Sequence, residues 1–133
     1  MRSSKWLVLL VCCVCLSLPL AAQKTTGTIS GVVTDQAGAV VPGSDVTATN
    51  TENGASRSAK SGASGEYVIT DLPAGTYNVS VKQANFREYI AKGVQLFVSS
   101  TATVNATLTV GSASEQMTVE ANAVQVDTAE RAR

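Results

Sequence analysis

The chain has 133 residues, with ten basic and ten acidic side chains, no histidine and three cysteines. This length fits a single small domain, and the balanced charge provides no basic surface for nucleic acid. The absence of histidine excludes Ser-His and Cys-His nucleophile systems, so the commonest routes to hydrolytic catalysis are closed.

The first 22 residues have the organisation of a secretory signal peptide. Arg2 and Lys5 precede an apolar run from Trp6 to Leu18, and small residues ending at Ala22 follow it. Pro19 ends the run before it reaches the roughly 20 apolar residues of a bilayer-spanning helix. We therefore expect a cleaved signal-peptide helix over residues 1–22 rather than a retained anchor, and a protein exported to the periplasmic face of an outer membrane or secreted.

All three cysteines, at positions 12, 13 and 15, lie inside this leader. None follows the small residue that a lipoprotein cleavage site requires, so we do not expect lipidation. The chain from Gln23 onward has no cysteine, which excludes disulfides and thiolate chemistry. This part carries eight basic and ten acidic residues, so its net charge is −2.

Apolar and polar residues alternate with a period of two throughout the region after the leader, and this pattern predicts strands. The first strand is expected over Gly27–Asp35, and the next begins at Val46 after a turn at residues 35–38 and a corner at Val41–Gly43. Ser56–Lys60 lacks large apolar side chains, which indicates an exposed edge strand.

The later strands follow the same alternation. One contains Tyr67 and Ile69, and after a Leu-Pro-Ala-Gly corner the next places Tyr77, Val79 and Val81 on its inner face. Residues 86–90 are expected as a short strand or loop, and further strands are predicted over residues 93–98 and 101–110. Glu115 to Ala121 is one more candidate extended segment.

Short strands at this spacing, with no helix between them, predict an all-β fold: an antiparallel seven-stranded β-sandwich over residues 23–111. Residues 112–133 are expected to form a linker. The predicted core consists of the inward-facing side chains Ile29, Val33, Val46, Ala48, Tyr67, Ile69, Leu72, Tyr77, Val79, Val81, Val94, Leu96, Val104, Leu108 and Val110.

Candidates for chemistry are few. Glu66 and Asp71 could form the carboxylate pair of a glycoside hydrolase, and acidic residues near turns could ligate calcium. Turn formation and surface exposure explain these residues better, so we expect no catalytic residue, no metal site and no cofactor.

Two aromatic residues provide an alternative function. Tyr89 and Phe97 lie on the opposite phase from their apolar neighbours, so both are expected on the surface. Exposed aromatic rings can pack against the apolar face of a sugar. A stand-alone carbohydrate-binding or adhesion module, with exposed loops or these two residues as its ligand surface, is therefore a second hypothesis.

The stretches GTISGVVTDQAGAVVPGSDVTATN and SGEYVITDLPAGTYNVSVKQANF resemble the carboxypeptidase regulatory-like domain, a transthyretin-like (prealbumin-like) sandwich. The resemblance rests on turn residues and inward-facing apolar residues: Gly31, Val33, Asp35, Gly38, Pro42, Gly43, Val46, Gly65, Tyr67, Leu72, Gly75, Tyr77, Val79, Val81 and Phe86. In metallocarboxypeptidases this domain follows the catalytic one and is not itself catalytic. The resemblance therefore implies a module that is not an enzyme.

The order of signal peptide, sandwich and polar extension is similar to the N-terminal extension of TonB-dependent outer-membrane receptors. Residues 114–121 (SEQMTVEA) resemble a TonB box, and residues 124–129 resemble the approach to a plug domain. The resemblance implies that TonB, and the plug and barrel of a parent receptor, are partners, and that the chain is either a fragment of such a receptor or a stand-alone exported domain. The box would pair with a strand of TonB through Glu115, Gln116, Met117, Thr118 and Val119.

Overall fold

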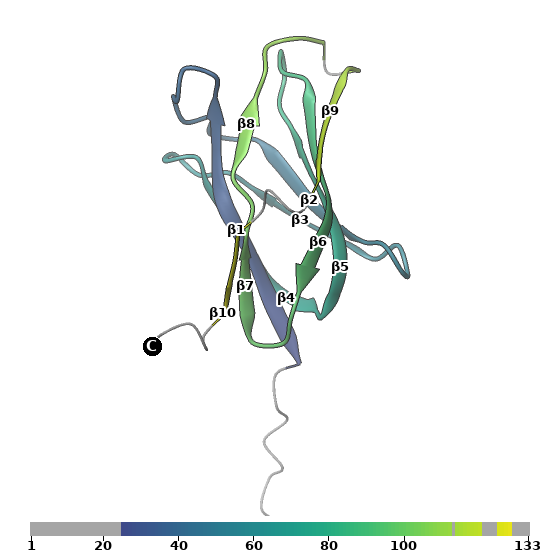
Figure 1. The fold of residues 1–133 in the computed structure, drawn as a ribbon. Coiled ribbons are helices and arrows are strands. Elements are labelled where there is room, and N and C mark those ends of the chain that lie inside the picture. The colour runs from purple at the N-terminus through teal and green to yellow at the C-terminus, as the bar shows by residue number, and fades with distance from the viewer. Residues whose placement is uncertain (1–24, 113, 121–124, 129–133) are drawn as a thin grey trace, which may run out of the picture.

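The computed structural model describes residues 25–112, 114–120 and 125–128. Every regular element in these residues is a β-strand (Figure 1), and the predicted signal-peptide helix lies outside them. The strands are β1 (Thr26–Asp35), β2 (Asp45–Asn50), β3 (Ser56–Lys60), β4 (Glu66–Pro73), β5 (Gly75–Lys82), β6 (Glu88–Leu96), β7 (Ser100–Thr103), β8 (Ala106–Leu108), β9 (Gln116–Glu120) and β10 (Gln125–Thr128).

The strands form two five-stranded sheets, so the predicted all-β sandwich is confirmed (Figure 1). Sheet 1 has the order β10-β7-β1-β4, and β8 pairs with the second half of β1. Sheet 2 has the order β3-β2-β5-β6-β9. Buried side chains from both sheets belong to one hydrophobic cluster, which fills the space between them.

The expected antiparallel, seven-stranded arrangement is wrong, because both sheets are mixed and the described residues form more strands. β7 and β8 run parallel to β1, and β9 runs parallel to β6. A tight hairpin enforces antiparallel pairing only when consecutive strands share a sheet. Most consecutive strands here lie in different sheets, and the crossings after β6 and after β8 each bring the new strand alongside a partner that runs in the same direction.

The predicted core is confirmed except at one position. Val110 is 69% exposed, because it lies beyond β8 and forms only an isolated bridge with Phe86. The core also contains five residues that the prediction did not include: Val41, Tyr89, Ala91, Ala102 and Ala106.

The predicted strand over residues 101–110 is interrupted between β7 and β8, and specific side chains stabilise the break. Tyr67 Oη donates a hydrogen bond to the Val104 carbonyl (2.5 Å), and Tyr89 Oη donates to the Asn105 carbonyl (3.4 Å). The Val32 amide donates a hydrogen bond to Asn105 Oδ1 (3.0 Å). At the break, this side-chain oxygen takes the place of a main-chain carbonyl as the acceptor.

Gly31 explains why the chain fits so closely at this break. A Cβ atom at this position would lie 1.9 Å from the Val104 carbonyl oxygen and 3.0 Å from Tyr67 Oη. Only glycine lets the two backbones approach to this distance. Burial, with a smaller contribution from Tyr89, raises the pKa of Tyr67, so its hydroxyl remains a donor over the whole physiological range.

Candidate functional site

The segment predicted to bind a partner, Glu115 to Val119, lies at the edge of sheet 2 (Figure 1). Most of it belongs to β9, which pairs with β6 from Glu88↔Gln116 to Lys92↔Glu120. Within the described residues no strand follows β9 in the sheet order. The segment is therefore extended, and one of its two edges is already paired.

The direction of the backbone groups of β9 follows from a single hydrogen bond. The Glu88 amide donates to the Glu115 carbonyl (2.9 Å), so the main chain of Glu115 points toward β6. Successive residues of a strand direct their N–H and C=O groups to opposite edges, so those of Met117 and Val119 also point toward β6. The alternate residues direct theirs to the outer edge: Gln116, Thr118 and Glu120.

The side chains of β9 alternate between core and solvent. Met117 and Val119 are half-buried and pack against the hydrophobic cluster, and Thr109 Oγ1 lies 3.9 Å from Met117 Sδ. The alternate side chains of the strand are exposed. Two apolar contacts and the backbone pairing therefore contribute most of the stability of β9 on β6.

Polar contacts fix the start of β9. Arg87 Nε lies 2.6 Å from Glu115 Oε2, and Gln116 Nε2 donates to Glu88 Oε2 (3.2 Å). Arg87 and Glu115 are about half exposed, so solvent screens their ion pair and it contributes at most about 1 kcal/mol. Glu88 is the more enclosed group, and it also lies 3.6 Å from Lys82 Nζ.

These contacts belong to a row of polar side chains that crosses the outer face of sheet 2. The register places one member on each strand, in the order Lys60, Asp45, Lys82, Glu88 and Gln116. Lys60 Nζ and Asp45 Oδ1 are 2.5 Å apart. Because the charges alternate, each charged side chain has an opposite neighbour, and the row is neutral.

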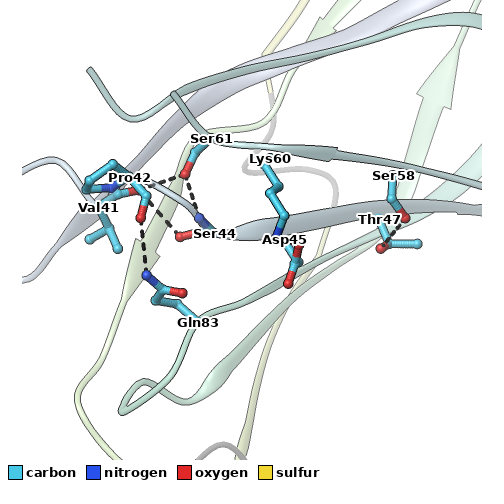
Figure 2. Close-up of polar contacts among 9 residues, drawn as sticks. All are labelled: Val41, Pro42, Ser44, Asp45, Thr47, Ser58, Lys60, Ser61 and Gln83. Atoms are coloured by element: carbon cyan, nitrogen blue, oxygen red, sulfur yellow. Dashed lines mark hydrogen bonds and ion pairs between the residues drawn. The ribbon is translucent and has the colours of Figure 1, made fainter. Parts of the chain in front are cut away.

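A shallow groove of about 370 Å³ lies beside this row, lined by Gly43, Asp45, Lys60, Lys82, Gln83, Ala84, Phe86 and Glu88. The corner at one end of the groove is held by buried serines (Figure 2). Ser61 Oγ donates to the Val41 carbonyl (2.8 Å) and accepts the Ser44 amide (2.9 Å). Gln83 Nε2 donates to the Pro42 carbonyl (3.1 Å), which connects the β5–β6 turn to the same corner.

The expectation that Tyr89 is exposed is wrong: its side chain is 7% exposed and belongs to the core. The cause is a β-bulge in β6. Gly93 has φ +71°, and the register with β5 shifts between the pairs Tyr77↔Val94 and Val79↔Ala91. The bulge changes the phase of β6, so residues on both sides of it face inward. The glycine at position 93 was the available signal in the sequence.

Phe97 is 51% exposed, as expected, and lies in the loop after β6 beside the exposed Val98. Tyr89 lies near the start of β6 and is buried beneath it, so the structure does not bring the two rings together. Of the two aromatic residues considered for a sugar-binding surface, only Phe97 is therefore exposed.

The described residues contain no group of three or more His, Cys, Asp or Glu side chains placed to hold a metal ion. Within the same residues no helix has the length and apolar character needed to cross a bilayer. Asp71, one of the two carboxylates considered for hydrolysis, has φ +57° at the irregular end of β4, and both it and Glu66 are exposed.

Comparison with protein families gives a match over residues 28–109 to the carboxypeptidase regulatory-like domain. The chain belongs to this family. The match extends from β1 to the end of β8, so β9 and β10 of this carboxypeptidase regulatory-like domain lie outside the matched region. No curated protein matches the sequence.

Several solved structures share the fold of this carboxypeptidase regulatory-like domain. An ancillary pilin of Streptococcus has a TM-score of 0.52 at 16% identity, over 67% of this chain and 34% of the pilin. A Bacteroides uniformis protein with a proposed role in carbohydrate binding has a TM-score of 0.50 at 20% identity, over 62% and 40% of the two chains.

A cohesin–X-dockerin complex of Acetivibrio cellulolyticus has a TM-score of 0.51 at 22% identity, over 64% of this chain and 58% of that one. The chain thus spans between about a third and three fifths of these proteins. At these identities the likeness concerns the fold alone. Together with the family, it describes a β-sandwich module.

Proposed function

We propose that this domain is a non-catalytic, exported sandwich that presents Glu115–Val119 to TonB, in the manner of the N-terminal domain of a TonB-dependent outer-membrane receptor. The observation that supports this proposal is the position of β9. The segment is already extended at the end of sheet 2, and no described strand covers its outer edge. A partner can therefore add a strand without any unfolding of the sandwich.

The outer edge offers an incoming strand the main-chain groups of three residues, Gln116, Thr118 and Glu120. Their side chains are exposed on the outer face of the sheet. Glu115 and Glu120 place a carboxylate near each end of β9, and both are exposed. This charge favours a partner strand with basic side chains at its ends, because complementary charges steer association and set the register.

The proposal is tested by Thr118→Pro, which removes the central outward-facing N–H. Proline is tolerated on an edge strand where its nitrogen faces away from the ladder, so β9 stays on β6. We expect binding of the periplasmic C-terminal domain of TonB, measured by pull-down and calorimetry, to weaken roughly tenfold or more.

Thr118→Val is the matched control, because it retains the N–H and the shape of the side chain. It should bind like the unmodified chain. Equal binding by the proline variant, with an unchanged circular dichroism spectrum, would show that TonB does not use this edge. The alternative is a stand-alone carbohydrate-binding or adhesion module. The burial of Tyr89 removes one of the two rings considered for its ligand surface, and Phe97 and the exposed loops are left.

A further inference from the structure

We infer that the outer edge of β9 also pairs with a second copy of this chain, antiparallel to it and about a twofold axis at Thr118. The two copies of sheet 2 then form one continuous sheet. This inference uses the same edge as the proposed function, but it requires neither TonB nor a parent receptor.

The edges of sheet 2 differ in how well they are protected. β3, at one end, carries Arg57 and Lys60, and Arg57 Nη1 donates to the Thr70 carbonyl of β4 (3.1 Å). Basic side chains and a covering strand are common devices that prevent an edge from pairing. β9, at the other end, contains no lysine, arginine or proline. No described strand pairs with it on its outer side. Its edge is therefore competent to pair.

Two copies of β9 that run antiparallel to each other bring favourable pairs of side chains together. With Thr118 opposite Thr118 of the second copy, Gln116 faces Glu120 and Met117 faces Val119. The outward-directed residues are then opposite one another, so each pair exchanges both of its main-chain hydrogen bonds. Two threonines, an amide with a carboxylate, and two apolar side chains are all favourable cross-strand pairs.

The neighbouring registers are less favourable. Antiparallel pairing must match outward-directed residues, so the register can shift only in steps of one such pair. One step pairs only Thr118, Val119 and Glu120 of the two β9 strands, so two of the five residues lose their partners in β9. The opposite step pairs only Gln116, Met117 and Thr118. It also places Glu115 opposite Val119, which brings a carboxylate beside a half-buried apolar side chain and competes with the contact of Glu115 to Arg87. The register centred on Thr118 pairs all five residues of β9.

The two half-buried side chains of β9 are the source of affinity beyond the backbone. Met117 and Val119 lie on the inner face of the strand and are only partly covered in the single chain. Across the twofold axis each covers the other, and this pairing occurs twice. A single pair of short strands buries less than the roughly 1,200 Å² of a stable interface, so the dimer is weak and reversible.

Sedimentation equilibrium of the exported chain over a wide concentration range tests this inference. We expect a reversible monomer–dimer equilibrium. Thr118→Glu and Thr118→Lys each place two like charges at the axis, and each should weaken dimerisation at least tenfold. An equimolar mixture of the two variants should restore the dimer, because opposite charges then meet there. A monomer at every concentration, or a Thr118→Glu variant that dimerises like the unmodified chain, would overturn the inference.

Both charged variants retain the Thr118 N–H, so they separate this inference from the proposed function. Capture of TonB by a Thr118→Glu chain that no longer dimerises supports the proposed function alone. Restored dimers in the mixture, without capture of TonB by any variant, support self-association alone. Exposed Thr118 makes no side-chain contact in the core, so circular dichroism should show the same fold for all of these proteins.

Discussion

Tyr67→Phe removes one hydroxyl from the interior of the sandwich and leaves the ring in place. Tyr67 is 2% exposed, and its hydroxyl donates to the Val104 carbonyl at the break between β7 and β8. Val104 is itself 1% exposed, so water does not readily replace the lost donor. A buried polar group left without a partner costs about 1–3 kcal/mol. For a domain of this size each kcal/mol corresponds to a melting temperature lower by roughly 4–8 °C.

Tyr77→Phe is the matched control for this measurement. Its ring is equally buried, but its hydroxyl donates to the Pro73 carbonyl (2.6 Å), and Pro73 is exposed. Solvent can hydrate that carbonyl after the substitution, so the loss should be about 1 kcal/mol or less. Urea unfolding at pH 7, with equal m-values, measures both variants. Equal losses for the two would refute the argument that the buried carbonyl at the break determines the cost.

Two further predictions concern the same break. Gly31→Ala places a Cβ atom against the Val104 carbonyl and should lower the free energy of unfolding in urea by about 3–5 kcal/mol. Gly38→Ala is the control: a Cβ atom there meets open space but the residue has φ +82°, so the loss should be only about 1 kcal/mol. Similar losses for the two variants would contradict the steric argument. Burial raises the pKa values of Tyr67 and Tyr89 above their ordinary value of 10.0, so the folded chain retains protons that the unfolded chain releases, and stability should fall as the pH rises above about 10. Tyr67→Phe should flatten that fall, and an unchanged slope would show that Tyr67 does not cause it.

Local alternation predicted most strands and nearly all of the core. The strict pattern over residues 76–82 matches β5, and the weak pattern over residues 56–60 matches the exposed strand β3. A period-two pattern reports which face of a strand is apolar, and this information is local. It fails where the phase changes within one strand, as at the bulge at Gly93, and for that reason Tyr89 was placed on the wrong face.

The long alternating stretch over residues 101–110 shows a second limit. Its pattern continues through Val104 and Asn105, yet the strand is interrupted there because Tyr67 and Gly31, distant in sequence, occupy the break. Asparagine is depleted in strands, so Asn105 was the one local indication of the interruption. The pairing of β9 with β6 could not be predicted from the sequence either, since nothing within residues 115–121 identifies the strand that they contact.

The amino-acid sequence by itself determined that most strands of this chain have an exposed and a buried face and that turns lie at several of its glycines and prolines. It also determined that the chain has no histidine and, from Gln23 onward, no cysteine for catalysis. Only the tertiary structure decided that both sheets are mixed and that Glu115–Val119 pairs with β6 along one edge, while no described strand pairs with the other edge. The physical reason is that side-chain alternation is set by neighbours along the chain, whereas strand pairing is set by where each crossing between the sheets brings the backbone.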